Sequence, residues 1–373
     1  MEVRIGSRRR WRSLALGVGI AAFVAACSTP GTSQAPSTAP TTAPSVAAPS
    51  AGASDAAPSA SAAGDALAEV CAAGVAEGKL VQWHNHSDNY VQVLDAFKAA
   101  YPGIEVEHLV LSPDESAQRI LTEVAAGRPP TPDLAAGGMD VFKPLLDRKL
   151  IATDADWVGL GVPEDVIHPA DNLVRVQRVA IGLGFNSDTT TAADLPNTWE
   201  ELIDAKWAGQ VIVDPRGRPF DGLSLEWGEE KTLDYVQRLK DIVQPLVIEG
   251  GTAGLVAVAG GEAAITTGGR SAETLEQQAE GAPIDIKYLD VIPTLDNYNV
   301  PLVGAAHPNA ATCFIAWLAA TGQPLFNEVE FKSNEAVPPQ APAGAKVLTI
   351  ETPEQADAVK AIGTEIGRIW TGG

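Results

Sequence analysis

Short apolar segments alternate with longer segments of helical periodicity along the chain from residue 79 onward. Strands are expected at 79–83, 104–110, 133–136, 179–186, 210–213 and 263–267. Helices are expected at 90–101, 112–125, 232–243, 271–280, 308–320 and 353–370. Because helices and sheets pack in layers, this alternation predicts an α/β fold in which helices cover both faces of the sheets.

Two segments carry the sequence pattern of a helix N-terminus. The sequences SPDE at 112–115 and TWEE at 198–201 both match a capping box, in which Ser or Thr and the Glu three residues later satisfy each other's backbone N–H groups. Pro113 strengthens the first prediction, because proline is favoured in the first turn of a helix. Helices are therefore expected to begin at both places.

The first 26 residues differ in kind from the rest. Four arginines between positions 8 and 12 precede an apolar run, 14–26, that is too short to span a bilayer comfortably. Small residues stand directly before Cys27, an arrangement that resembles a bacterial lipoprotein signal. We expect 1–26 to be a removed signal peptide and Cys27 to carry a lipid that anchors the exported protein to the outer face of the cell membrane. An ordinary secretory signal is the alternative, and Sec and twin-arginine export both stay open.

A tether is expected to follow the signal. Residues 27–63 are almost wholly Ser, Thr, Ala, Pro and Gly, so they have little apolar surface to bury and are predicted to be disordered. Without residues 1–26 the chain holds 21 Lys and Arg against 46 Asp and Glu, a formal charge of −25. That charge argues against a nucleic-acid partner.

Two cysteines follow Cys27, namely Cys71 and Cys313. In an oxidising compartment such a pair forms a disulfide or stays as two separate buried thiols, and the sequence leaves both open. No Cys/His cluster with the spacing of a zinc site occurs in the sequence.

Several short motifs between 78 and 320 occur in an order that resembles a known family. They are GKLV at 78–81, YPGI at 101–104, GFNS at 184–187, DLP at 194–196, TWEEL at 198–202, KWAG at 206–209, DPR at 214–216 and HPNAA at 307–311. In this order, behind a lipoprotein signal, they resemble the extracellular solute-binding lipoproteins of ABC importers. The similar group includes the ferric-iron, polyamine, thiamine and phosphonate binders.

The resemblance implies a two-lobed, type II periplasmic-binding-protein fold with mixed sheets flanked by helices and two hinge crossings. Lobe one would comprise 64–181 and 292–373, and lobe two would comprise 182–291. A small solute would be captured between the lobes and passed to a membrane permease, with no cofactor and no catalysis. A ligand sensor with the same fold and a lipid-anchored hydrolase are the alternatives, although the sequence holds no GxSxG, HExxH or P-loop motif.

Four strand-to-helix connections are candidates for the ligand site, because ligands of open α/β sheets meet the carboxyl ends of strands and the N-termini of helices. The candidate ligand-binding residues are His84, Asn85 and His86; Gly137 and Gly138; Asp214 and Arg216; and Thr267, Gly268, Gly269 and Arg270. His84 and His86 face the same way on an extended chain, so they are candidate metal ligands, with ordinary loop histidines as the alternative. The connection before Ser271 is the strongest candidate, since glycine amides, a helix N-terminus and Arg270 would all favour an anion.

The positions of the tyrosines bear on the ligand. The ferric-binding branch of the family carries adjacent tyrosines where this chain has Gly268 and Gly269, while Tyr288 and Tyr298 are separated and lie later. The resemblance therefore implies a small anion, an anion-bearing metabolite or a metal carried with an anion, rather than ferric iron held by a tyrosine pair.

Overall fold

The computed structural model describes residues 60–372. The predicted signal peptide, Cys27 and the predicted tether up to residue 59 lie outside the described residues. The end of the predicted tether is wrong, because residues 60–63 open the helix α1 (Ala60–Glu77). Apolar periodicity predicts no helix there; the segment is rich in alanine, whose high intrinsic helix propensity supports α1 instead.

A mixed sheet of ten strands is the framework of the described part of the chain, with β2–β1–β3–β9–β4–β7–β5–β6 as its main path. The strands are β1 (Lys79–His84), β2 (Glu105–Val110), β3 (Leu134–Gly137), β4 (Val174–Asn186), β5 (Val211–Val213), β6 (Leu246–Val247), β7 (Ile265–Arg270), β8 (Ile284–Lys287), β9 (Val291–Pro301) and β10 (Lys346–Leu348). Parallel pairs join β1 to β2 and β3, and β5 to β6 and β7, while β9 and β4 run antiparallel. The predicted α/β class with mixed sheets is confirmed.

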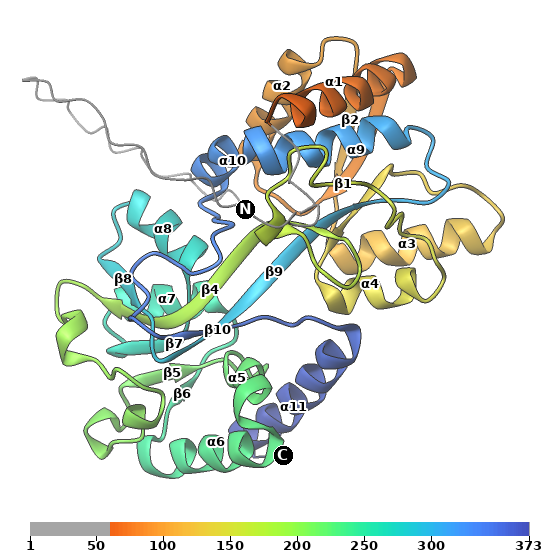
Figure 1. Ribbon diagram of the computed structural model, residues 1–373. Helices are drawn as coiled ribbons and strands as arrows, with labels where there is room; N and C mark the ends of the chain where they lie inside the picture. The colour runs from red at the N-terminus through yellow and green to blue at the C-terminus, as the bar shows by residue number, and fades with distance from the viewer. Residues whose placement is uncertain (1–59, 373) are drawn as a thin grey trace, which may run out of the picture. The chain divides into compact units, whose positions relative to one another are not determined.

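Two long strands connect the two halves of this sheet (Figure 1). Strand β4, of 13 residues, pairs with β9 up to Ala180 and with β7 from Ile181 onward. Strand β9, of 11 residues, pairs with β10 up to Pro293 and with β4 from Thr294 onward. Each strand therefore takes part in both halves, and the antiparallel pair that they form is the connection between them.

Helices lie against both halves of the sheet (Figure 1). Those associated with β1–β3 are α1, α2 (Val91–Ala100), α3 (Pro113–Ala125), α4 (Met139–Leu146), α9 (Pro308–Trp317) and α10 (Gln323–Glu330). Those associated with β5–β8 are α5 (Phe220–Trp227), α6 (Glu229–Val243), α7 (Gly251–Ala259) and α8 (Ser271–Ala279).

Only one of the two predicted capping boxes opens an α-helix. Ser112 Oγ accepts the backbone N–H of Glu115 at 3.2 Å, and α3 begins at Pro113. Thr198 Oγ1 also accepts the N–H of Glu201, but the segment continues only as a single 3₁₀ turn, Glu200–Leu202. Both segments carry the capping pattern, but only α3 also has a long apolar stripe, whose packing stabilises further helical turns.

The half built on β1–β3 has its own aromatic core. Phe97 packs edge-on against Phe314 with ring centroids 5.0 Å apart, and Trp317 lies 5.3 Å from the same ring. Cys71 of α1 and Cys313 of α9 are joined by a disulfide in this core. The disulfide ties the first described helix to α9, across 242 residues of sequence.

The C-terminal helix α11 (Pro353–Thr371) spans both halves. Near its start, Ala356 packs in the cluster that contains α4 residues. Farther along, Ile366 and Trp370 are buried with Phe220 and other residues of the half that contains β5. The sequence analysis places all of 292–373 in lobe one. Because most of α11 packs with the half that contains β5, we propose that it belongs to lobe two.

Candidate functional site

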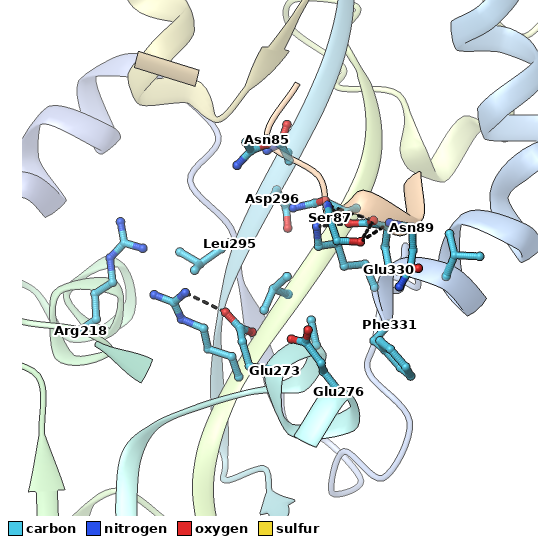
Figure 2. Close-up of a pocket in the computed structure, with 17 residues that line it drawn as sticks. Asn85, Ser87, Asn89, Arg218, Glu273, Glu276, Leu295, Asp296, Glu330 and Phe331 are labelled. Atoms are coloured by element: carbon cyan, nitrogen blue, oxygen red, sulfur yellow. Dashed lines mark hydrogen bonds and ion pairs between the residues drawn. The ribbon is translucent and has the colours of Figure 1, made fainter. Parts of the chain in front are cut away.

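Two cavities border the strand pair β4–β9. The smaller, of 430 Å³, is lined by residues from the β1–α2 and β5–α5 connections, β4, the start of α8, β9, and the end of α10 with the segment after it (Figure 2). The larger, of 760 Å³, is lined by the starts of α3 and α4, the β5–α5 connection, β9 and α11. Three residues line both cavities, namely Arg218, Leu295 and Asp296. We treat the two cavities as one candidate ligand site with a shared wall.

Asp296 in that wall is neutralised by an arginine of the neighbouring strand. Arg178 Nε donates to Asp296 Oδ1 at 2.8 Å and Arg178 Nη2 donates to Asp296 Oδ2 at 2.6 Å. Arg178 also donates to the carbonyl oxygen of Ala336 and to Thr349 Oγ1. A carboxylate held by two charge-assisted bonds has little attraction left for a ligand cation.

The predicted histidine pair lies behind the cavity wall. His84 and His86 are 3% and 6% exposed, and of this loop Asn85 and Ser87 line the smaller cavity. His84 Nε2 lies 3.0 Å from His108 Nδ1, and His86 Nδ1 lies 3.6 Å from Glu330 Oε2. Neither histidine lines either cavity, because the alternating side chains of β1 and its extension direct both of them into the core.

The same burial decides the charge of these histidines. Burial, reinforced by the neighbouring His86 and His108, lowers the pKa of His84 to about 3. Burial likewise lowers the pKa of His86. Among residues 60–372 there is no group of three or more His, Cys, Asp or Glu side chains arranged to hold a metal ion.

The two predicted glycines after β3 have different surroundings. Gly138 lines the larger cavity and is the N-cap of α4, as expected of a glycine that presents backbone to a ligand. Gly137 is buried in β3, and a Cβ on it would lie 3.0 Å from Val141 Cβ. Gly137 therefore serves the close packing of β3 on α4 and does not reach the cavity.

The predicted pair after β5 is an ion pair. Arg216 lines the larger cavity, and Asp214 holds it through a contact of 2.6 Å between Asp214 Oδ2 and Arg216 Nη2. Asp214 also accepts the N–H groups of Arg216 and Gly250, and it is not among the lining residues. Asp214 thus organises the β5–α5 connection, while Arg216 is the residue of the two that faces the cavity.

The predicted loop 267–271 is wrong as a loop. Strand β7 continues to Arg270 and α8 begins at the next residue, Ser271. Thr267 Oγ1 donates to the carbonyl oxygen of Ile212, and a Cβ on Gly269 would lie 2.4 Å from Gly184 N. Thr267, Gly268 and Gly269 are thus buried in the sheet, and Gly269 allows β7 to pass close to β4.

Of Thr267, Gly268, Gly269 and Arg270, Arg270 is the residue that lines the smaller cavity. Its Nη1 donates to Glu273 Oε1 at 3.0 Å, and both side chains are 22% exposed. An arginine that is already paired with a carboxylate of the helix that follows it is a weaker anion anchor than an unpaired one. The strongest candidate from the sequence is therefore only partly supported by the geometry.

Arg218 belongs to the candidate connection 214–218 but was not chosen as a site residue, unlike Arg216 in the same β5–α5 connection. It lines both cavities. Its side chain makes no hydrogen bond or contact ion pair within the described chain, but its charge acts on the buried carboxyl of Asp221, which also lines the larger cavity. The only available signal was the second arginine of the sequence DPRGR, which sequence alone does not distinguish from the first.

Further charged residues of the smaller cavity also escaped prediction: Glu273, Glu276, Glu330 and Lys332. Lys332 Nζ donates to Glu330 Oε2 at 2.9 Å, and Ser87 donates its N–H and hydroxyl to the same carboxylate. Although burial opposes ionisation of Glu330, contacts from His86, Ser87 and Lys332 lower its pKa below the ordinary value. These side chains come from α8, from the end of α10 and from the segment after α10, which are distant in sequence, so no local motif marks them.

The tyrosines do not form a pair at the site. Tyr298 lines the larger cavity, whereas Tyr288 lines a separate cavity of 420 Å³ between α8 and the segment after Phe331. Burial raises the pKa of Tyr288 to about 12. Among the described residues, a ferric site built from two adjacent phenolates is therefore absent.

Two α/β lobes joined by a pair of long strands, with cavities beside those strands, define a type II periplasmic binding protein. The sequence matches the model of the bacterial extracellular solute-binding protein family over residues 83–323, and the chain belongs to that family. The comparison with curated proteins gives no match.

Solved structures with the same fold include several binding proteins of low sequence identity. Iron-bound HitA from Pseudomonas aeruginosa has 17% identity and a TM-score of 0.62, with 78% of this chain and 99% of HitA covered. The Trichodesmium protein IdiA (FutA), in complex with iron and citrate, has 15% identity and a TM-score of 0.60, with 78% and 98% covered. AfuA from Actinobacillus pleuropneumoniae, bound to fructose-6-phosphate, has 16% identity and a TM-score of 0.57, with 76% and 97% covered. The predicted two-lobed fold and solute-binding role are confirmed.

None of the helices within residues 60–372 combines the length and the apolar character that crossing a bilayer requires.

Proposed function

We propose that this chain is the solute-capturing component of an ABC importer. A lipid on Cys27 anchors it to the outer face of the cell membrane. Its solute carries an anionic group, which Arg218 binds. Family membership supports the binding role, and the sequence around Cys27 supports the anchor. The permease would receive the solute when the lobes open. A sensor role differs only in the membrane partner, and a hydrolase has no support from the family.

One observation carries the assignment of Arg218. Its guanidinium borders both cavities and makes no ion pair at contact distance with a carboxylate of residues 60–372, whereas Arg216 and Arg270 each make one. The Arg218 charge acts only at longer range on the buried carboxyl of Asp221. An unpaired guanidinium in a partly enclosed site favours carboxylate or phosphate, which it binds through two parallel hydrogen bonds. The ligands of two structural neighbours, citrate with iron and fructose-6-phosphate, are in keeping with an anionic solute.

Calorimetric titration tests the proposal. The mature chain with Cys27→Ser, which carries no lipid, would be titrated with inorganic phosphate, ethyl phosphate, citrate, ferric citrate, fructose-6-phosphate and spermidine. We expect at least one anion to bind and Arg218→Met to weaken its binding about tenfold to a hundredfold. Arg148→Met is the matched control, since Arg148 is exposed and lines neither cavity. Binding of spermidine alone, or equal affinity in Arg218→Met, would overturn the proposal.

The anchor has its own test. We expect the full chain to fractionate with membranes and the Cys27→Ser chain to be released into the soluble exported fraction. An unchanged membrane association of Cys27→Ser would contradict a lipid on Cys27.

A further inference from the structure

The charges that line the smaller cavity are mostly paired with one another. Arg270 is paired with Glu273, and Lys332 is paired with Glu330. Asp296 is paired with Arg178, which lies behind the wall. Of the seven charged residues that line this cavity, five are thus held in ion pairs with protein groups.

The two charged residues of the smaller cavity that form no ion pair have opposite charges. Arg218 is one, and Glu276 is the other; the Glu276 side chain is exposed, and within the described chain its carboxylate has no ion pair and no hydrogen bond with protein groups. Figure 2 shows Arg218 on one side of the cavity, while Glu276 projects from α8 on the far side of Glu273. The cavity therefore has a positive end and a negative end.

Two further acceptors without partners line the same cavity, one on α8 and one on β4. Glu273 Oε2 and Gln177 Oε1 are buried and make no hydrogen bond, although both residues line the cavity. A buried acceptor that has lost water and gained no donor is unfavourable. A group with several donors and no acceptor would satisfy these oxygens, and an ammonium group is such a group.

We propose that the solute is a small zwitterion, whose anionic group binds Arg218 and whose protonated amine binds at Glu276, Glu273 and Gln177. The proposal rests on the proposed function and adds a second, cationic requirement to it. A cavity of 430 Å³ holds a compact molecule with the two charges a few bonds apart. Bare anions match only one end of such a site, and they leave the acceptors at α8 without a donor.

Matched pairs of probes separate the two ends. Phosphoethanolamine and ethyl phosphate share the phosphate and differ in the amine, and glycerol 3-phosphate offers hydroxyl donors without a positive charge. We expect phosphoethanolamine to bind the Cys27→Ser mature chain at least about tenfold tighter than either of the others, as is typical of a charge-assisted contact. Glu276→Gln should reduce that ratio to below about threefold. Glu280→Gln, at the C-cap of α8 and outside the cavity, should leave the ratio as it is.

The outcomes distinguish this inference from the proposed function. If the three phosphates bind equally and Arg218→Met weakens them all, the anion site stands and the amine site is wrong. If glycerol 3-phosphate binds tightest, the acceptors serve hydroxyl groups, and the zwitterion is again wrong. If none of the three binds while ethanolamine or spermidine does, the anionic solute itself is refuted.

Discussion

Arg178 and Asp296 stand directly opposite each other on the two strands that connect the lobes, and two hydrogen bonds of 2.8 and 2.6 Å join them. Their side chains are 9% and 4% exposed. The ion pair lies in the wall of the candidate site and also in the connection that would flex if the lobes moved. It thus sets the charge of the wall, because it removes Asp296 from competition for ligand cations.

Removing one member of this pair should be costly. Asp296→Ala leaves the Arg178 charge buried without its carboxylate, so we expect the free energy of unfolding to fall by about 3–5 kcal/mol. Glu200→Ala is the control, because it breaks the exposed pair with Arg238 and should cost less than about 1 kcal/mol. Urea unfolding followed by tryptophan fluorescence measures both. Equal costs for the two variants would show that the pair contributes nothing beyond a surface contact.

The disulfide between Cys71 and Cys313 should contribute to stability because it restricts the unfolded chain. Replacing both cysteines by serine should lower the free energy of unfolding by about 2–5 kcal/mol. A reducing agent should destabilise the unmodified protein by a similar amount and leave the double variant unaffected. Two titratable thiols in the unreduced, denatured mature Cys27→Ser chain would contradict the bond.

The alternation of strands and helices was predictable because burial imposes periodicity on each element. The apolar stripe of α3 and the alternating pattern of β1 both mark their elements in the sequence. Helix α1 was not predicted, because its alanines favour a helix through intrinsic propensity and leave no apolar stripe in the sequence. The packing of α11 on both halves was not predicted either, because it depends on tertiary contacts that no local pattern encodes.

The candidate site was predictable only in part, for a related reason. Asn85, Gly138, Arg216 and Arg270 line the cavities because connections after strands reach the same edge of the sheet. His84 and Gly269 do not, because a shift of one residue in a strand moves a side chain to the opposite face. Glu276 and Lys332 lie on or after helices far apart in sequence, and only folding brings them to one cavity.

Acid should destabilise the fold through the buried histidines. The pKa of His84 is lowered to about 3 and that of His86 is also lowered, so below pH 6.5 the unfolded chain takes up protons that the folded chain does not. The stabilisation is fully present above pH 6.5 and is lost as the pH falls toward the folded pKa. Each histidine adds a slope of about 1.4 kcal/mol per pH unit within that window. Lowering of the Glu330 pKa acts in the same direction below about pH 4.5.

Substitution of His84 checks that assignment. Urea unfolding of His84→Asn between pH 7 and 4 should give a slope smaller by about 1.4 kcal/mol per pH unit than that of the unsubstituted chain. Because Asn does not titrate, a difference in stability that is the same at every pH would instead assign the effect to packing. An unchanged slope would place the acid sensitivity on other groups.

The close approach of β7 to β4 gives the last prediction. A Cβ at residue 269 would lie 2.4 Å from Gly184 N and 2.8 Å from Gly184 Cα, both backbone atoms that cannot rotate away. We therefore expect Gly269→Ala to force the strands apart and to lower the free energy of unfolding by about 1–3 kcal/mol. If residues 267–271 formed an exposed loop instead, the same change would be nearly neutral.

A second glycine isolates the effect of that contact. Gly64 lies in the exposed part of α1 with no atom near its added Cβ, so Gly64→Ala should stabilise the chain by about 0.5–1 kcal/mol through helix propensity. The two substitutions add the same methyl group and should shift the urea midpoint in opposite directions. Because β4 also carries Arg178 toward Asp296, a displaced β7 should weaken solute binding as well, which calorimetric titration of Gly269→Ala measures. A normal midpoint with normal binding would mean that β7 does not pass against Gly184.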